Sequence, residues 1–171
     1  DYAFWQCSSL ASVSLGNGVK TTGYGAFAYC TALTNVILPD SLTSLGNYTF
    51  YRASFLTNVT FGAGLKNIGI AALSDNPRLK SLVLPSGLTN IGNYAFNNNT
   101  GMTNIAIPSG VTTIGSYAFG NNDGLTNIVI PDTVTSIGDR AFEQSAVLSS
   151  VNLGQGLVSL GAGAFWICDG L

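Results

Sequence analysis

The sequence predicts a mainly β repeat solenoid, in which 23-residue rungs stack along one axis and add strands to a parallel sheet. An apolar anchor recurs every 23 residues without insertion or deletion, and one glycine position is filled in seven successive repeats. Apolar and polar residues alternate after each anchor, which is typical of a half-buried strand. The anchors are Leu10, Leu33, Leu56, Leu79, Met102, Leu125, Leu148 and Leu171, and the glycines are Gly23, Gly46, Gly69, Gly92, Gly115, Gly138 and Gly161.

The repeats form one continuous array over residues 1–171, of about seven rungs. A period in the twenties with the apolar pattern L-x-x-[VIL]-x-[LIF] predicts a leucine-rich-repeat solenoid in particular. Such an array stacks rungs and need not close a globular core. Residues 1–10 match the second half of a repeat and Leu171 is an anchor, so we expect both ends to be cut within a repeat, with any signal peptide and caps outside this segment.

Each rung is expected to contain two extended segments. In the repeat that starts at Leu125, inward apolar residues alternate with outward Asn127 and Val129, which predicts a short parallel strand over residues 127–130. Pro131 follows it, and because proline cannot donate to a strand ladder the strand should end there. The run from Val134 to Ile137 is apolar at both ends and predicts a second, shorter extended segment that faces the first.

Two further positions recur in the remainder of the rung, and each forms a column of equivalent residues through the array. The invariant glycine indicates either a positive φ or a close approach of neighbouring backbones. It is followed by a repeated Ala-Phe pair, as in Ala118-Phe119, which predicts a spine of stacked phenyl rings through the array. The short polar run from the phenylalanine to the next anchor predicts one helical or 3₁₀ turn per rung.

The three cysteines occupy one column of the repeat, three residues before the anchor. Adjacent rungs lie about 4.8 Å apart, so Cys7 and Cys30 come within reach of a disulfide. Parallel side chains on neighbouring rungs rarely meet the required dihedral angle, and we therefore favour buried free thiols.

Composition excludes several classes of function. Only 8% of residues are charged and the net charge is −2, so no basic surface is available for nucleic acid. The apolar stretches are far shorter than the roughly 20 residues of a membrane helix. There is no histidine and a single glutamate, Glu143, which argues against an enzyme and against imidazole metal sites. Asp123-Gly124 lacks the spacing of a calcium loop and is interpreted as a turn. We expect no cofactor and no metal.

The motif I-P-x-x-V-T-x-I-G-x-x-A-F-x-x-[CN]-x-x-L, present from Ile107 to Leu125, resembles the Treponema-type leucine-rich repeat of BspA-like surface antigens. The resemblance covers the whole chain, with departures at Thr22, Gly62 and Leu73. It implies a cell-surface or secreted protein that adheres to host matrix, plasma proteins or other cells. It implies no catalytic residues.

The outward side chains of the predicted strands form a flat, uncharged face. Two interpretations are open: the face recognises a glycan or protein, or its residues only favour strand stacking through like-with-like ladders. The two outward columns are Asn35, Asn58, Ser81, Asn104, Asn127 and Ser150, and Ile37, Thr60, Val83, Ala106, Val129 and Asn152.

Large side chains break the repeat in one region, and this region is our candidate partner contact. Phe55 and Arg78 lie one rung apart in one column, where they are placed to form a cation–π pair. Arg52 and Asp75 are placed similarly for an ion pair. Because tyrosine and arginine are enriched at binding hot spots, the predicted contact residues are Tyr29, Tyr51, Arg52, Phe55 and Arg78. The alternative is that these residues only repair an irregular rung around Pro77.

Two functions from different classes follow from these observations. The first is a non-enzymatic, extracellular or cell-surface recognition and adhesion segment that binds a protein or glycan, such as host matrix or another cell surface. The second is a structural building block, in which rungs self-associate into an extracellular filament or envelope layer.

Overall fold

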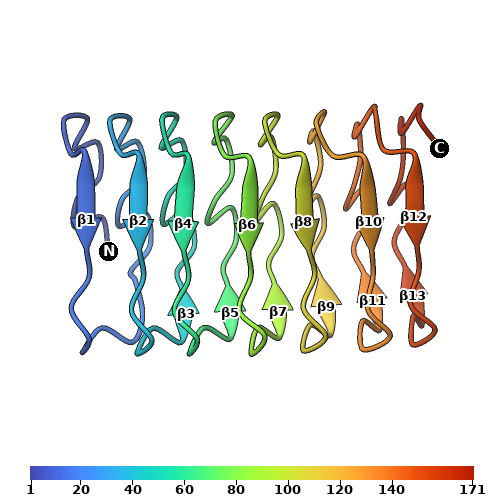
Figure 1. Cartoon of the computed structure of the whole chain (residues 1–171), viewed down its shortest axis with the longest axis horizontal. Helices are drawn as coiled ribbons and strands as arrows, with labels where there is room; N and C mark the ends of the chain where they lie inside the picture. Colours follow the sequence, from blue (N-terminus) through green and yellow to red (C-terminus); the bar gives the residue numbers. More distant parts are fainter.

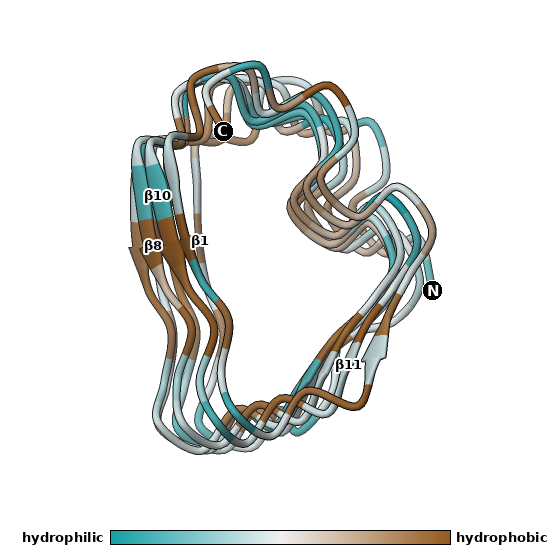
Figure 2. Cartoon of the chain, turned by 90° about the vertical axis from the view of Figure 1, so that its right-hand side faces the viewer, coloured by the Kyte–Doolittle hydropathy of each residue, from teal (hydrophilic) through white to brown (hydrophobic).

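The computed structural model describes all residues 1–171, which form a parallel β-solenoid whose rungs stack in a nearly straight row (Figure 1). Each rung from β2 onward carries one longer and one shorter strand on opposite sides of its cross-section (Figure 2), and in the rung of β1 a single bridge between Thr21 and Ser44 takes the place of the shorter strand. The longer strands are β1 (Ser12–Ser14), β2 (Asn35–Ile37), β4 (Asn58–Thr60), β6 (Ser81–Val83), β8 (Asn104–Ala106), β10 (Asn127–Val129) and β12 (Ser150–Asn152). The shorter strands are β3 (Ser44–Leu45), β5 (Asn67–Ile68), β7 (Asn90–Ile91), β9 (Thr113–Ile114), β11 (Ser136–Ile137) and β13 (Ser159–Leu160).

The predicted strands and their order are confirmed. The strand expected over residues 127–130 is β10, and the second extended segment contains β11. Neighbouring rungs pair in parallel with equivalent residues opposite each other, as Asn127 lies opposite Ser150. The shorter strands form one continuous six-stranded sheet, whereas the longer strands divide into β1-β2-β4, β6-β8 and β10-β12.

A single hydrophobic core fills the inside of the coil. In each internal longer strand the central residue is buried and its two neighbours are exposed, as Ile128 is between Asn127 and Val129. The anchors from Leu33 to Leu148 are fully buried. Alternation at period two therefore places one row of side chains in the core and two rows on the outer face.

The predicted phenylalanine spine is present but divided. The rings of Phe96, Phe119 and Phe142 stack nearly parallel, with centroids 5.3 Å apart. Leu73 stands where the next ring is expected, so the stack that ends at Phe50 does not meet the stack that begins at Phe96. Stacking of this kind adds to the area that each ring buries.

The cysteine column has a shared physical role, which is to donate a hydrogen bond to the preceding rung. Cys30 Sγ donates to the carbonyl oxygen of Phe4 at 3.1 Å, and Asn122 Nδ2 donates to that of Phe96 at the same distance. All three thiols are free, as favoured from the sequence. The expectation that all are buried is wrong for Cys7, which is exposed.

The expected helical or 3₁₀ turn is absent, and the structure contains no helix that could cross a membrane. Each rung instead has two residues with left-handed backbone, four positions apart, such as Tyr48 at φ 57° and Arg52 at φ 55°. A right-handed helix needs successive negative φ angles. The amides of Tyr48, Phe50 and Arg52 bond to carbonyls of the following rung, so they are unavailable for a helical ladder.

The invariant glycine column is explained by close approach and not by a positive φ. A Cβ on Gly115 would lie 2.5 Å from the backbone nitrogen of Asn93 and 2.6 Å from the carbonyl carbon of Gly92, both in the preceding rung. Backbone atoms cannot move aside as the end of a flexible side chain can. A side chain in this column would therefore push neighbouring rungs apart, and glycine permits their close spacing.

Candidate functional site

The candidate contact residues lie on the turn edge of the coil, in the segments that precede β2, β4 and β6. The amide of Ala53 bonds to the carbonyl of Phe50 at 3.3 Å, and Arg52 occupies the third position of this turn with φ 55°. A left-handed residue at that position is the arrangement of a type II turn. Tyr29 and Asp75, in the same column, have φ 60°. The three side chains therefore leave equivalent turns on successive rungs.

Arg52 is the centre of the cluster. Its Nε lies 3.9 Å from Asp75 Oδ1, which confirms the pair expected from the sequence. Its guanidinium carbon lies 5.2 Å from the ring centroid of Tyr51 and 5.8 Å from that of Tyr29. Because the arginine side chain is 52% exposed, the ion pair contributes at most about 1 kcal/mol to folding.

The carboxylate of Asp75 is held in place by neutral donors as well. Ser74 Oγ donates to Asp75 Oδ2 at 2.8 Å, and Asn98 Nδ2 donates to Oδ1 at 2.8 Å. A carboxylate has about four lone-pair sites. Acceptor capacity therefore remains for a ligand that approaches from solvent.

Phe55 and Arg78 form the second expected pair. The guanidinium carbon of Arg78 lies 3.8 Å from the ring centroid of Phe55, which confirms the cation–π contact. Phe55 is nevertheless 45% exposed and Arg78 is exposed. An exposed pair of this type contributes about 0.5 to 1 kcal/mol to the free energy of folding. The contact therefore stabilises the fold only slightly, and both side chains stay accessible to a partner.

The aromatic part of the cluster is larger than the sequence predicted. Tyr51 contacts Tyr29 and Tyr48 edge to face, each with ring centroids 5.5 Å apart. Trp5 extends the row, with its ring 5.0 Å from that of Tyr29. From the sequence, Tyr48 is interpreted as corner packing, because Tyr94 and Tyr117 share its position in the repeat, and Trp5 is not singled out. Trp5 occupies the same position of the repeat as Tyr51, two rungs earlier, and this shared position is the sequence signal that would have joined it to the site.

Burial raises the pKa of the Tyr51 hydroxyl, and the nearby carboxylate of Asp75 raises it further. Arg52 acts in the opposite direction. The hydroxyl therefore stays protonated near neutral pH and is available as a hydrogen-bond donor.

A shallow groove of about 410 Å³ runs beside these residues and supplies hydrogen-bonding groups of several kinds. Thr31 and Ser54 contribute hydroxyls, and Asn98 contributes an amide. Asn98 is part of this site although the sequence did not single it out, and Pro77, which the sequence marks as the centre of the irregular rung, also lines the groove. The groove is lined by Tyr29, Thr31, Arg52, Ser54, Asp75, Pro77 and Asn98.

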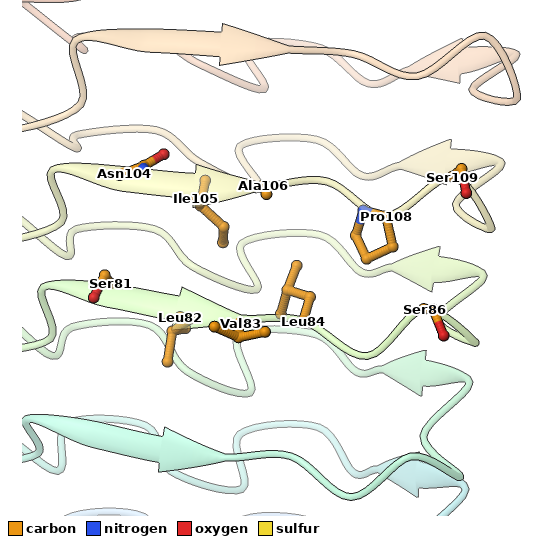
Figure 3. A pocket seen from close by; sticks show the side chains of 10 residues that line it. All are labelled: Ser81, Leu82, Val83, Leu84, Ser86, Asn104, Ile105, Ala106, Pro108 and Ser109. Atoms are coloured by element: carbon orange, nitrogen blue, oxygen red, sulfur yellow. The ribbon is translucent and has the colours of Figure 1, made fainter.

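A second hollow, of about 420 Å³, lies between β6 and β8 on the sheet of longer strands (Figure 3). Val83 and Ala106 occupy equivalent positions on its two strands, and Ser86 and Ser109 lie beyond the strand ends. This hollow belongs to the uncharged outer face and is separate from the turn edge.

The chemistry of both places is that of noncovalent binding. The turn edge offers aromatic faces, two guanidinium groups and an oriented carboxylate, and the outer face offers amides, hydroxyls and apolar side chains. No group of three or more histidine, cysteine, aspartate or glutamate side chains is placed to hold a metal ion.

The sequence matches the family model described as the BspA type leucine-rich repeat region, in six copies, over residues 1–101 and 89–171. No curated protein matches the chain. Among solved structures, the leucine-rich repeat protein of T. pallidum is similar with a TM-score of 0.87 and 27% identity, over 94% of this chain and 78% of that one.

Two further structures show the same fold at lower identity. A leucine-rich repeat protein of Bacteroides ovatus matches with a TM-score of 0.66 and 22% identity, over 92% of this chain and 49% of that one. A leucine-rich cell surface protein of Faecalibacterium prausnitzii matches with a TM-score of 0.56 and 22% identity, over 99% of this chain and 61% of that one.

Proposed function

Because the chain belongs to the BspA-type leucine-rich repeat family, we propose that it is a non-enzymatic recognition and adhesion segment of an extracellular or cell-surface protein. The family points to protein binding or adhesion in general. The proposed partner is a protein or glycan of host matrix or of another cell, bound at the turn edge. Repeat scaffolds of this kind act through their surface, and nothing on the turn edge is arranged as a nucleophile with a general base.

One observation carries this proposal. The large side chains that break the repeat gather at one place on the surface and lie beside a groove, and the core does not require them there. Tyr51 and Arg52 belong to the residue types that dominate binding hot spots. The oriented carboxylate of Asp75 and the amide of Asn98 add directional hydrogen bonds. A partner that fits the groove would meet aromatic faces and polar groups together.

Surface location is supported by composition and by one relative. The protein of F. prausnitzii with the same fold is described as a cell surface protein. In this chain, Ser, Thr, Asn and Gly cover the surface, and only 8% of residues are charged.

The test is the double substitution Arg52→Ser with Phe55→Ser, assayed by surface plasmon resonance on immobilised matrix proteins and on a glycan array. Binding by the unchanged chain that weakens at least tenfold in the double variant supports the proposal. Arg140→Ser is the matched control, because it removes another exposed-edge arginine with a cation–π contact, 4.6 Å from the Trp166 ring. Equal binding by the double variant and the unchanged chain contradicts the proposed site.

A second function, assembly through the repeats, is favoured by a different observation. The outer face of the longer strands is uncharged, and exposed Ile37, Val83 and Val129 stand on it. Self-association would cover this face without desolvating any charge.

A further inference from the structure

Successive rungs of the array are not equivalent on the outer face, because a large apolar side chain stands on every second strand. Ile37, Val83 and Val129 are 63%, 88% and 61% exposed. Thr60, Ala106 and Asn152, on the strands between them, are smaller or polar. Since adjacent strands lie about 4.8 Å apart, the apolar side chains form ridges at intervals of about 10 Å, with a hollow between each pair.

The same two-rung alternation is built into the backbone at another corner of the coil. Asp1 Oδ1 accepts a hydrogen bond from the amide of Tyr24, and the equivalent bond recurs on every second rung thereafter. The recurring bonds join Asn47 to Ile70, Asn93 to Ser116 and Asp139 to Ala162, at 2.8, 2.9 and 2.7 Å. The structural unit of the array is therefore a pair of rungs.

The outward polar column beside the ridges is free to bind. No side-chain hydrogen bond joins Asn58, Asn104 or Asn127 to an equivalent residue on a neighbouring rung, unlike the shorter-strand sheet, where Asn90 Nδ2 donates to Asn67 Oδ1 at 2.6 Å. Hydrogen bonds between rungs thus account for the polar column of the shorter strands, but they do not engage Asn58, Asn104 or Asn127 on the longer strands.

We propose that this face packs against the same face of a second copy of the chain, with the two solenoid axes antiparallel. A two-fold axis between the rungs of Val83 and Ala106 places Val83 over the partner's Ala106. The same axis places Val129 over the partner's Thr60 and Ile37 over the partner's Asn152, so every ridge meets a hollow. The proposal rests on the assembly function named above, and it adds which rung of one copy faces which rung of the other.

A second copy is the occupant that the surface fits best. An opposing surface must carry ridges at the same spacing of about 10 Å, and a copy of this chain carries them by construction. No strand residue of the face is charged, so the two copies do not repel each other. The nearly straight row of rungs in Figure 1 allows contact along the whole array. Interdigitating side chains are the ordinary basis of sheet-on-sheet packing.

The area sets the strength of this contact. A face about 30 Å long and about 15 Å wide buries about 900 Å² in total over the two copies, which is below the range of about 1,200 to 2,000 Å² for stable interfaces. The pair is therefore expected to form only at high local concentration, as on a crowded cell surface.

The experiment is sedimentation equilibrium of the whole chain from about 10 μM to about 1 mM, with a fit for monomer and dimer. The unchanged chain should dimerise with increasing concentration. Val83→Ala sets hollow against hollow and Ala106→Val sets ridge against ridge, so each should weaken dimerisation on the order of tenfold. The double variant Val83→Ala with Ala106→Val exchanges ridge and hollow and should recover most of the association. Gln144→Lys, on the turn edge, is the control and should dimerise as the unchanged chain does.

Three results would overturn the proposal: a chain that remains monomeric at about 1 mM, single variants that dimerise normally, or a double variant that is weaker than both singles. If the chain is monomeric but Val83→Ala loses binding to a matrix protein, the face serves a different partner. The turn edge is tested separately. Arg52→Ser with Phe55→Ser should dimerise normally, and Val83→Ala should keep any partner bound at the turn edge, so failure of one proposal is distinguishable from failure of the other.

Discussion

The region from residue 51 to 78 and the region from residue 94 to 147 use the same repeat but differ both inside and outside. In the later region three phenyl rings stack without interruption, and Asn99 and Asn122 continue a buried hydrogen-bond ladder. In the earlier region Leu73 interrupts the ring stack and Ala53 provides no donor. The exposed Arg52, Phe55 and Arg78 stand on that irregular region.

The comparison shows that departures from the repeat in the core and on the surface occur together. Asn76 Oδ1 is a buried polar atom without a hydrogen-bond partner, because the backbone amide of Ala53 in the preceding rung bonds to the carbonyl of Phe50 instead. The large surface side chains do not fill these internal gaps, because Arg52 pairs with Asp75 beside the groove and Phe55 and Arg78 contact each other on the surface. The irregular region therefore has a less complete core, and its surface residues contribute only weak, exposed contacts.

The largest expected effect lies in the regular region. Phe119→Ala removes a fully buried ring from the middle of a stack, and the rigid neighbouring rungs cannot close the cavity. The free energy of unfolding should fall by about 3 to 5 kcal/mol. Urea unfolding followed by circular dichroism measures it, and a loss below about 1 kcal/mol would contradict the role assigned to the ring stack.

Gly115→Val is expected to cost about 3 kcal/mol, because its Cβ would overlap backbone atoms of the preceding rung. Gly16→Ala is the control, since an added Cβ there has no neighbour within 4 Å. Thermal unfolding of both variants provides the measurement. Equal melting temperatures for Gly115→Val and the unchanged chain would remove the close-approach argument.

Two substitutions in the buried hydrogen-bond ladder that contains Asn76, Asn99 and Asn122 should change the free energy of unfolding in opposite directions. Asn99→Ala leaves the buried backbone amide of Asn76 without its partner and removes one of the two donors to the carbonyl of Leu73, at a cost of about 1 to 3 kcal/mol. Ala53→Asn supplies the missing donor toward the carbonyl of Phe27 and should stabilise the chain by about 1 kcal/mol. Ala53→Val, which has no donor, is the control. Destabilisation by Ala53→Asn to the same extent as by Ala53→Val would show that the gap is not a missing hydrogen bond.

The smallest expected effect depends on pH. Burial raises the pKa of Tyr51 above its ordinary value of 10.0, so folding disfavours the phenolate. The associated stability is fully present below pH 10 and is lost as the pH rises through the folded-state pKa. Tyr51→Phe should therefore lose less stability between pH 9 and 11.5 than the unchanged chain. Urea titrations across this range measure it, and parallel curves would contradict the assigned environment of Tyr51.

Sequence alone predicted those features that repeat, because each recurs at a fixed offset and one physical reason serves every copy. The 23-residue period predicts the strands and the phenylalanine column. It also predicts the pairs on adjacent rungs, which are Arg52 with Asp75 and Phe55 with Arg78. The left-handed turns could not be predicted, since tyrosine and arginine are unusual at positive φ and do not signal it. Trp5 and Asn98 share the repeat positions of Tyr51 and Arg52, but they lie outside the stretch from residue 29 to 78 in which large side chains break the repeat, so their roles at the site were missed.

The central claim is that the exposed residues of the irregular region are not needed by the fold, and one measurement tests it most directly. The free energy of unfolding is determined by urea titration for Arg52→Ser with Phe55→Ser, beside Phe119→Ala. The account predicts a loss clearly below the about 3 to 5 kcal/mol expected for Phe119→Ala, because the double variant removes only exposed contacts, namely the ion pair of Arg52 with Asp75 and the cation–π contacts of Arg52 and Phe55. A loss as large as that of Phe119→Ala would show that these side chains hold the stack together and would contradict the account.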